Sequence, residues 1–232
     1  MDHAAAVANL VEANHILARE EILNSYGHIS FRDPENPERF LLSRSRSAEQ
    51  VSGDDILTFG LDGEPVEPTK QKLYMERYIH SGIYARHPHI NSVIHAHTVA
   101  VLPFAISDIP FVPVVGSASP IGTKAPVWDI ADTFGPQTTL LVTNREMGAD
   151  LADAFDDGHC VLMRGHGMAV TGGTILDAVR SAIEIRDNAT ILLSALAAGG
   201  TPKPLHPEEI QARNEFTFDS ARGWENWIAR SR

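Results

Sequence analysis

The sequence predicts a single domain of the α/β class. Segments with helical spacing of apolar residues alternate with short runs rich in β-branched residues, as expected for helices packed on a sheet. The 232 residues are enough for one large core, and no repeat, low-complexity tract or linker divides them. We therefore expect one domain over residues 1–232, with a C-terminal helical extension at about 201–232.

The N-terminal half is expected to contain two helices, a hairpin and a strand. Apolar residues recur at helical spacing from Val7, and Gly27 suits the end of that helix. Short apolar runs between residues 27 and 63 are separated by Asp-Pro and Asn-Pro turns, which indicates a β-hairpin. Residues 70–86 are predicted to form a helix, and residues 92–99, which are rich in β-branched side chains, a strand.

The second half follows the same alternation after a stretch rich in proline and glycine at 99–136, which is expected to form loops and short strands around a cavity. The elements expected next are a strand at 138–143, a helix at 144–155, a glycine-interrupted strand at 159–170 and a long helix at 174–198. Thr174 suits the N-cap of the long helix, and Pro207 opens a last helix.

Composition excludes several classes of function. Nineteen Lys and Arg stand against thirty Asp and Glu, and the formal net charge of −11 disfavours a general nucleic-acid binder. A small anionic substrate held by a few local arginines is still compatible with that charge. The start has no signal-peptide pattern, and no stretch reaches the roughly 18 apolar residues of a membrane span. Cys160 is the single cysteine, so we expect a soluble protein of the reducing cytoplasm without an intrachain disulfide.

Three of the eleven histidines form a candidate metal site. His95 and His97 are spaced i, i+2 in a predicted strand, so their side chains share one face, roughly 6.6 Å apart at the backbone. His166 lies between Gly165 and Gly167, and these glycines permit a sharp turn and a close approach of the backbone. Three histidines with one open position are typical of a catalytic zinc site, although the alternative is three polar residues unrelated to a metal.

A glutamate and a turn extend this pattern into a resemblance. Glu76 lies nineteen positions before His95, and residues 27–30 read Gly-His-Ile-Ser. This order, followed by His97 and His166, resembles the class II aldolase/adducin family over roughly residues 7–200. The resemblance implies a three-layer α/β/α sandwich with a mostly antiparallel central sheet. It also implies homotetramers with active sites at subunit interfaces, histidine metal ligands, and a Glu76 that is either a catalytic acid/base or a further ligand.

The departures from the family pattern indicate the substrate class. Sugar-phosphate aldolases of this family hold phosphate with an Asn in the first turn, a Thr/Ser-Gly turn and a Ser-Ser pair before the glutamate. Here His28 stands in the first turn, Tyr74 stands near the glutamate, and the second element carries Ser43, Arg44 and Arg46. Arginine binds carboxylates bidentately and stacks on planar rings, so a flat carboxylated substrate is favoured over a phosphate. The alternative for either arginine is a solvated loop residue.

Two further segments are similar to a branch of the family that decarboxylates. They are residues 38–49, ERFLLSRSRSAE, and residues 162–167, LMRGHG. The resemblance implies a metal-dependent decarboxylase of an ortho-hydroxylated aromatic or heteroaromatic dicarboxylate, such as a dihydroxyphthalate. The divalent ion, zinc by expectation and manganese, cobalt or iron as alternatives, would act as a Lewis acid.

The catalytic assignments leave alternatives open. Glu76, or a water that it orients, is the first candidate for proton delivery, with His28 and Tyr74 as alternates. His206 is a candidate substrate contact, because family members often bring a C-terminal segment across the active site. His80 is expected at a surface or helix end. The competing functions are an aldolase acting on a non-phosphorylated 2-keto acid or sugar acid, a non-catalytic adducin-like scaffold and a non-haem iron oxygenase.

Overall fold

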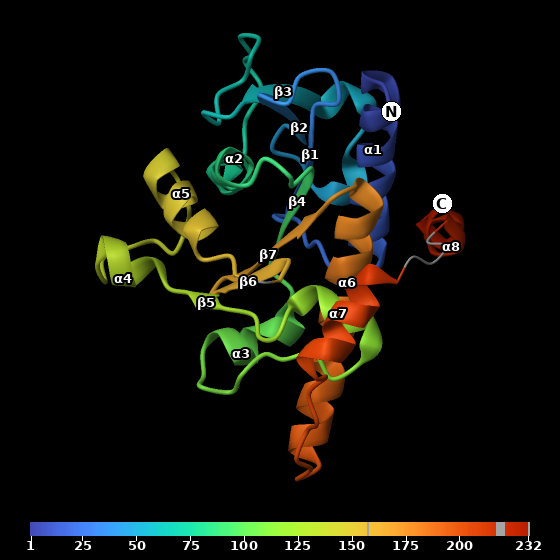
Figure 1. The fold of residues 1–232 in the computed structure, drawn as a ribbon. Coiled ribbons are helices and arrows are strands. Elements are labelled where there is room, and N and C mark those ends of the chain that lie inside the picture. Colours follow the sequence, from blue (N-terminus) through green and yellow to red (C-terminus); the bar gives the residue numbers. More distant parts are fainter. Residues whose placement is uncertain (157, 217–220, 232) are drawn as a thin grey trace.

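A computed structural model describes residues 1–156, 158–216 and 221–231, which contain a seven-stranded sheet of order β3-β2-β1-β4-β7-β6-β5 (Figure 1). The strands are β1 (His28–Arg32), β2 (Arg39–Ser43), β3 (Ile56–Gly60), β4 (Ser92–Ala96), β5 (Val127–Trp128), β6 (Cys160–Met163) and β7 (Gly167–Gly172). The short strand β5 pairs parallel to β6, whereas the other neighbouring strands pair antiparallel. The sheet is therefore mixed, which corrects the expectation of a mostly antiparallel sheet.

Helices flank the sheet. The α-helices are α1 (His3–Arg19), α2 (Arg77–Arg86), α3 (Leu102–Ala105), α4 (Ile130–Phe134), α5 (Arg145–Asp153), α6 (Ile175–Ala197), α7 (Pro207–Glu215) and α8 (Ala221–Ser231). The 3₁₀ turns are η1 (Ala48–Gln50), η2 (Gly53–Asp55), η3 (Val99–Val101) and η4 (Gly116–Ile121). Within the described residues, no helix is long and apolar enough to cross a membrane.

Two hydrophobic cores follow from the alternation of side chains along the strands. On β2, Leu41 packs into a core that includes buried residues of α1 and α6. Its neighbours Phe40 and Leu42 pack into a second core with residues of α2 and α5, because successive side chains of a strand point to opposite faces. This second core holds α2, and therefore the segment that leads into it, against the sheet.

Several expected elements are confirmed and others are corrected. The hairpin of β1 and β2, helix α5 and the Thr174 cap of α6, which accepts a hydrogen bond from the Asp177 backbone, agree with the sequence prediction. The first helix ends at Arg19 rather than near residue 27, because the chain turns back at Glu21, where φ is 57°. The second helix begins at Arg77 rather than at residue 70. The residues before it extend along the loop after β2, and the Lys72 carbonyl accepts a hydrogen bond from the Ser45 backbone N–H of that loop.

Candidate metal centre

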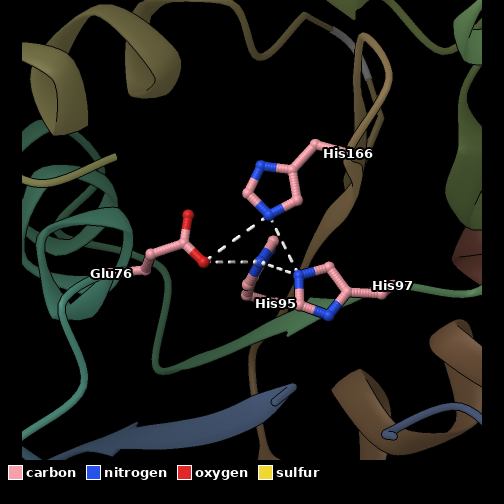
Figure 2. Close-up of side chains that lie close together, drawn as sticks. All are labelled: Glu76, His95, His97 and His166. Atoms are coloured by element: carbon pink, nitrogen blue, oxygen red, sulfur yellow. Dashed lines mark hydrogen bonds and ion pairs between the residues drawn. The ribbon is translucent and has the colours of Figure 1, made fainter. Parts of the chain in front are cut away.

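Four side chains from three parts of the chain converge at one end of the central strands (Figure 2). His95 lies in β4, whereas His97, which was expected in the same strand, directly follows it because β4 ends at Ala96. His166 lies in the turn between β6 and β7, which the pairing of β7 with β4 brings alongside. Glu76 is the residue before α2. One potential ligand atom from each of the four lies within 4.8 Å of the others.

The distances place three imidazole nitrogens and one carboxylate oxygen around a single point. Nε2 of His97 lies 3.1 Å from Nε2 of His95 and 2.9 Å from Nε2 of His166. Oε2 of Glu76 lies 3.4 Å from Nε2 of His95 and 3.5 Å from Nε2 of His166. His95 is fully buried and Glu76 nearly so, whereas His97 and His166 are partly exposed toward the solvent side.

The second nitrogen of each imidazole shows that this point suits a cation. Each Nδ1 faces an oxygen that can only accept a hydrogen bond, so each Nδ1 carries the proton in the neutral ring. The acceptors are the Met168 carbonyl for His95 at 3.2 Å, Oδ1 of Asn24 for His97 at 3.2 Å and the Leu140 carbonyl for His166 at 2.7 Å. Three Nε2 lone pairs and a carboxylate therefore face one another, which fits a divalent ion held by N and O ligands.

The electrostatics of the cluster agree with this assignment. Burial would raise the pKa of Glu76, but the charges and hydrogen bonds of His95 and His166 outweigh it and hold that pKa far below its usual range. Burial, followed by the neighbouring His95 and His166, lowers the pKa of His97 to about 4. Burial also opposes protonation of His166, yet its contact with Glu76 raises the pKa of that ring. At neutral pH the cluster thus holds an ionised carboxylate, so any proton on His166 must leave when a cation binds.

Glycines shape the turn that carries His166. Gly165 has φ of 65°, a conformation that favours glycine. A Cβ on Gly167 would lie 2.2 Å from the Ala96 carbonyl oxygen of the neighbouring strand. The close approach and the positive φ expected from the Gly-His-Gly sequence are both confirmed.

The segment 138–143 supports the cluster rather than forming the strand that the sequence predicts. Leu140 has φ of 62°, an uncommon value for this residue type, and its carbonyl accepts the hydrogen bond from His166. The backbone N–H of Val142 donates to Oε1 of Glu76 at 3.1 Å. Because these backbone groups bind the site side chains, they are not available to pair with a strand.

A cavity of about 270 Å³ adjoins the cluster. Its lining consists of Tyr26, His28, Ser45, Leu73, Tyr74, Met75, Glu76, His97 and Leu141. The rings of His28 and Tyr74 lie against each other, with centroids 4.3 Å apart. Two candidate catalytic residues and two members of the cluster therefore share one largely apolar pocket.

The chain can be placed among known proteins on both sequence and fold. The family described as Class II Aldolase and Adducin N-terminal domain matches residues 8–193. This chain belongs to that family. Its fold is also that of an aldolase II superfamily protein from Pseudomonas syringae, with a TM-score of 0.80 at 19% identity over 99% of this chain and 93% of the other.

Among curated members of the class II aldolase family, decarboxylases are similar to this chain over nearly its whole length. Decarboxylase tropJ of Talaromyces stipitatus is 34% identical to this chain, in an alignment that covers 96% of this chain and 92% of the relative. A 3,4-dihydroxyphthalate decarboxylase of Arthrobacter keyseri is 29% identical, covering 99% and 95%. These relationships identify the chain as an enzyme of the lyase type.

In the loop after β2, the two arginines contact an aspartate, whereas the serine between them faces the cavity. Arg44 pairs with Asp55 through Nε at 2.6 Å, and Arg46 donates to the Gln50 carbonyl and lies 3.4 Å from the same aspartate. Ser45 between them lines the cavity instead. Ser45 was not among the residues predicted for the site, although the alternation of side chains in an extended segment could have indicated it.

The remaining predicted site residues occupy distinct positions. The Tyr74 hydroxyl donates to the Arg46 carbonyl, accepts from its N–H at 3.3 Å and lies 3.3 Å from the Ser43 hydroxyl. His206 is an exposed residue at the start of α7 and is not among the residues that line the cavity. His80 is fully buried, which corrects its expected place at the surface.

Proposed function

We propose that this class II aldolase family member is a divalent-metal-dependent decarboxylase of an ortho-hydroxylated aromatic or heteroaromatic carboxylic acid. The observation that carries the proposal is the cluster of three Nε2 lone pairs and the Glu76 carboxylate beside the cavity that Glu76 and His97 help to line. The decarboxylase names of the two curated relatives support the reaction type. A single aromatic ring with its substituents suits a cavity of about 270 Å³.

His95, His97, His166 and Glu76 are the residues that would hold the ion, with zinc as the expected metal and manganese, cobalt or iron as alternatives. A divalent ion bound there supplies Lewis-acid stabilisation to the electron pair left when the C–C bond breaks. Because Glu76 is held as a carboxylate, we assign it to ion binding and to orienting a water, rather than to direct donation of a proton.

The walls of the cavity select and orient the substrate in this proposal. Leu73, Tyr74 and Leu141 would cover the faces of a planar ring and exclude water from the reacting carbon. Ser45 can donate a hydrogen bond to a substrate carboxylate, and the flanking Arg44 and Arg46 add positive charge beside it. Since the Tyr74 hydroxyl is engaged by the Arg46 backbone, its ring rather than its hydroxyl is the functional part.

His28 is the protein group best placed to contact the reacting end of the substrate. Its Nδ1 is occupied by His80, and among the described residues its Nε2 has no protein hydrogen-bond partner while its ring lines the cavity. In the reaction the bond to the carboxylate breaks to release CO₂, and the ring carbon takes one proton from an oriented water, which is left as hydroxide and regains a proton from solvent. His28 would hold the substrate oxygen in place during this exchange.

A tetramer with sites at the subunit interfaces also belongs to this proposal. Tyr26 and Met75 line the cavity yet are 73% and 56% exposed, so a second copy of the chain would cover them. His206 would reach substrate only in such an assembly.

The proposal is tested by incubating the enzyme with 3,4-dihydroxyphthalate and measuring released CO₂. We expect activity that EDTA removes and added Zn²⁺ or Mn²⁺ restores, and we expect His95→Ala to abolish both activity and bound metal. His89→Ala, an exposed histidine outside the cluster, is the matched control. Absence of metal-dependent CO₂ release from a panel of ortho-hydroxylated aromatic acids, with cleavage of a 2-keto sugar acid instead, would establish the aldolase alternative.

A further inference from the structure

A chain of buried hydrogen bonds leads away from the cavity through His28. Nδ1 of His28 lies 2.6 Å from Nε2 of His80, and Nδ1 of His80 lies 2.6 Å from the Ser30 hydroxyl. The Ser30 hydroxyl lies 2.7 Å from the hydroxyl of Tyr84, which ends the chain 3.4 Å from the Asn91 carbonyl. The cluster residues do not take part in these contacts.

The chain is built from matching positions on two elements. His28 and Ser30 are spaced i, i+2 on β1 and share a face, while His80 and Tyr84 are spaced i, i+4 on α2 and share a side of the helix. The hydrogen bonds therefore alternate between strand and helix. Phe40 stacks on the His80 ring at 6.3 Å between centroids and limits its rotation.

Burial requires these groups to be satisfied by one another. His28, Ser30, His80 and Tyr84 are all 1% exposed or less. Burial, followed by the nearby His95, lowers the pKa of His80 to about 3, so this ring is neutral and carries a single proton. A neutral imidazole that bonds on both sides must donate through one nitrogen and accept through the other. The direction of the hydrogen bond between Ser30 and His80 therefore fixes the direction of the hydrogen bond between His80 and His28.

The end of the chain selects that direction. The 2.7 Å contact between Ser30 and Tyr84 can run in either direction, because the Tyr84 hydroxyl could instead donate to the Asn91 carbonyl at 3.4 Å. That carbonyl already accepts a hydrogen bond from the Arg32 backbone N–H at 2.7 Å, and the more acidic phenol hydroxyl of Tyr84 is a stronger donor than the Ser30 hydroxyl, so Tyr84 donates to Ser30. When Tyr84 donates to Ser30, Ser30 donates to Nδ1 of His80, and Nε2–H of His80 donates to Nδ1 of His28. Nδ1 of His28 is then an acceptor, so the proton of His28 is on Nε2, toward the cavity.

We propose that Tyr84, Ser30 and His80 are positioning residues that fix His28 in the tautomer with its proton on Nε2, making it a hydrogen-bond donor to an oxygen of the bound substrate. The substrate part of this statement rests on the proposed function, whereas the tautomer of His28 does not. A donor held in this way favours an oxyanion or carboxylate at that position and disfavours a cationic group.

The tautomer is tested directly by ¹⁵N NMR of protein labelled at histidine, with His28→Gln identifying the resonances of His28 by their loss. We expect the unmodified protein to show His28 protonated on Nε2. His80→Leu should leave the His28 ring as a mixture of tautomers, and Tyr84→Phe should produce a smaller change in the tautomer populations of His28. Tyr78→Phe is the matched control. It removes a hydroxyl that lies on the same helix but donates to Glu64, and it should leave the tautomer of His28 unchanged.

The catalytic consequence is tested with 3,4-dihydroxyphthalate as substrate. We expect His80→Leu to raise KM about tenfold or more, the value of a hydrogen bond to a charged group, with bound metal unchanged. His80→Gln, whose amide can donate to His28 and accept from Ser30, should restore KM to within about threefold. If His80→Leu does not fold, His80→Gln and Tyr84→Phe still decide the tautomer.

The two proposals fail separately. A His28 protonated on Nδ1 in the unmodified protein, or unchanged spectra in His80→Leu, would overturn the inference whatever the enzyme decarboxylates. Absence of CO₂ release with the expected tautomer would instead count against the proposed function alone.

Discussion

Two glutamates in this enzyme have pKa values shifted in opposite directions by their surroundings. Glu76 is buried among histidines whose hydrogen bonds and charges hold its pKa far below the usual range. Glu184 on α6 is also removed from water, but its neighbours Arg180 and Arg213 compensate less, and burial raises its pKa from 4.5 to about 7. The first carboxylate is thus prepared for a cation, whereas the second is ionised at neutral pH only at a cost in stability.

Glu184→Gln is expected to stabilise the protein at pH 8 and to have little effect at pH 4.5. The folded state holds the Glu184 proton more tightly than the unfolded state, so stability falls as pH rises from about 4.5 to about 7 and then levels off. The shift corresponds to about 3 kcal/mol at most. Solvent screening of this partly buried side chain reduces the expected gain to about 1 kcal/mol.

Urea denaturation at the two pH values measures this gain. Glu49→Gln, a substitution at an exposed glutamate of η1, serves as the matched control for the loss of a surface carboxylate. Equal stability changes for Glu184→Gln at pH 4.5 and pH 8 would contradict the assignment.

At the scale of elements, sequence patterns predicted the features that depend on neighbouring residues alone, and missed those that depend on tertiary contacts. The glycines around His166 require only turn geometry, and the predicted turn is confirmed. The i, i+2 spacing of His95 and His97 does bring the two rings together, although β4 ends at Ala96, one residue earlier than predicted for His97. The segment 138–143 has the composition of a strand but binds His166 and Glu76 through its backbone, which is a tertiary effect. The burial of His80 likewise depends on how α2 docks on β1, so its spacing could not reveal it.

The docking of α2 against α5 is expected to be sensitive to a single methyl group. A Cβ on Gly148 of α5 would lie 2.1 Å from the Tyr78 carbonyl oxygen of α2, and neither backbone can move without separating the helices. We expect Gly148→Ala to lower the free energy of unfolding by about 1–3 kcal/mol. We also expect weaker metal binding, since α2 follows Glu76 directly.

Chemical denaturation and metal titration measure the two effects. Gly173→Ala is the matched control, because its Cβ would meet nothing closer than 3.8 Å. A Gly148→Ala variant as stable as the Gly173→Ala control would show that the helices can separate at little cost.

At the scale of the whole molecule, the metal cluster joins segments that are far apart in the chain. Glu76 comes from the entry to α2, His95 and His97 from the end of β4, and His166 from the turn before β7. The unfolded chain holds no such arrangement, so an ion that binds the cluster binds the folded state selectively. The spacing of the histidines, and then the family resemblance, made these residues candidates in advance, but the Nδ1 partners that suit them to an ion, such as Asn24, become visible only in the folded chain.

Metal removal is therefore expected to lower the melting temperature. At a free ion concentration 100 times Kd, selective binding stabilises the fold by about 2.7 kcal/mol. For a chain of this size each kcal/mol shifts Tm by about 2–4 °C, so EDTA should lower Tm by about 5–11 °C. Differential scanning calorimetry with and without Zn²⁺ measures the shift. His95→Ala, which removes one of the three imidazole nitrogens, should melt at the same temperature in both conditions. A shift of the same size in that variant would place the stabilising ion elsewhere in the protein.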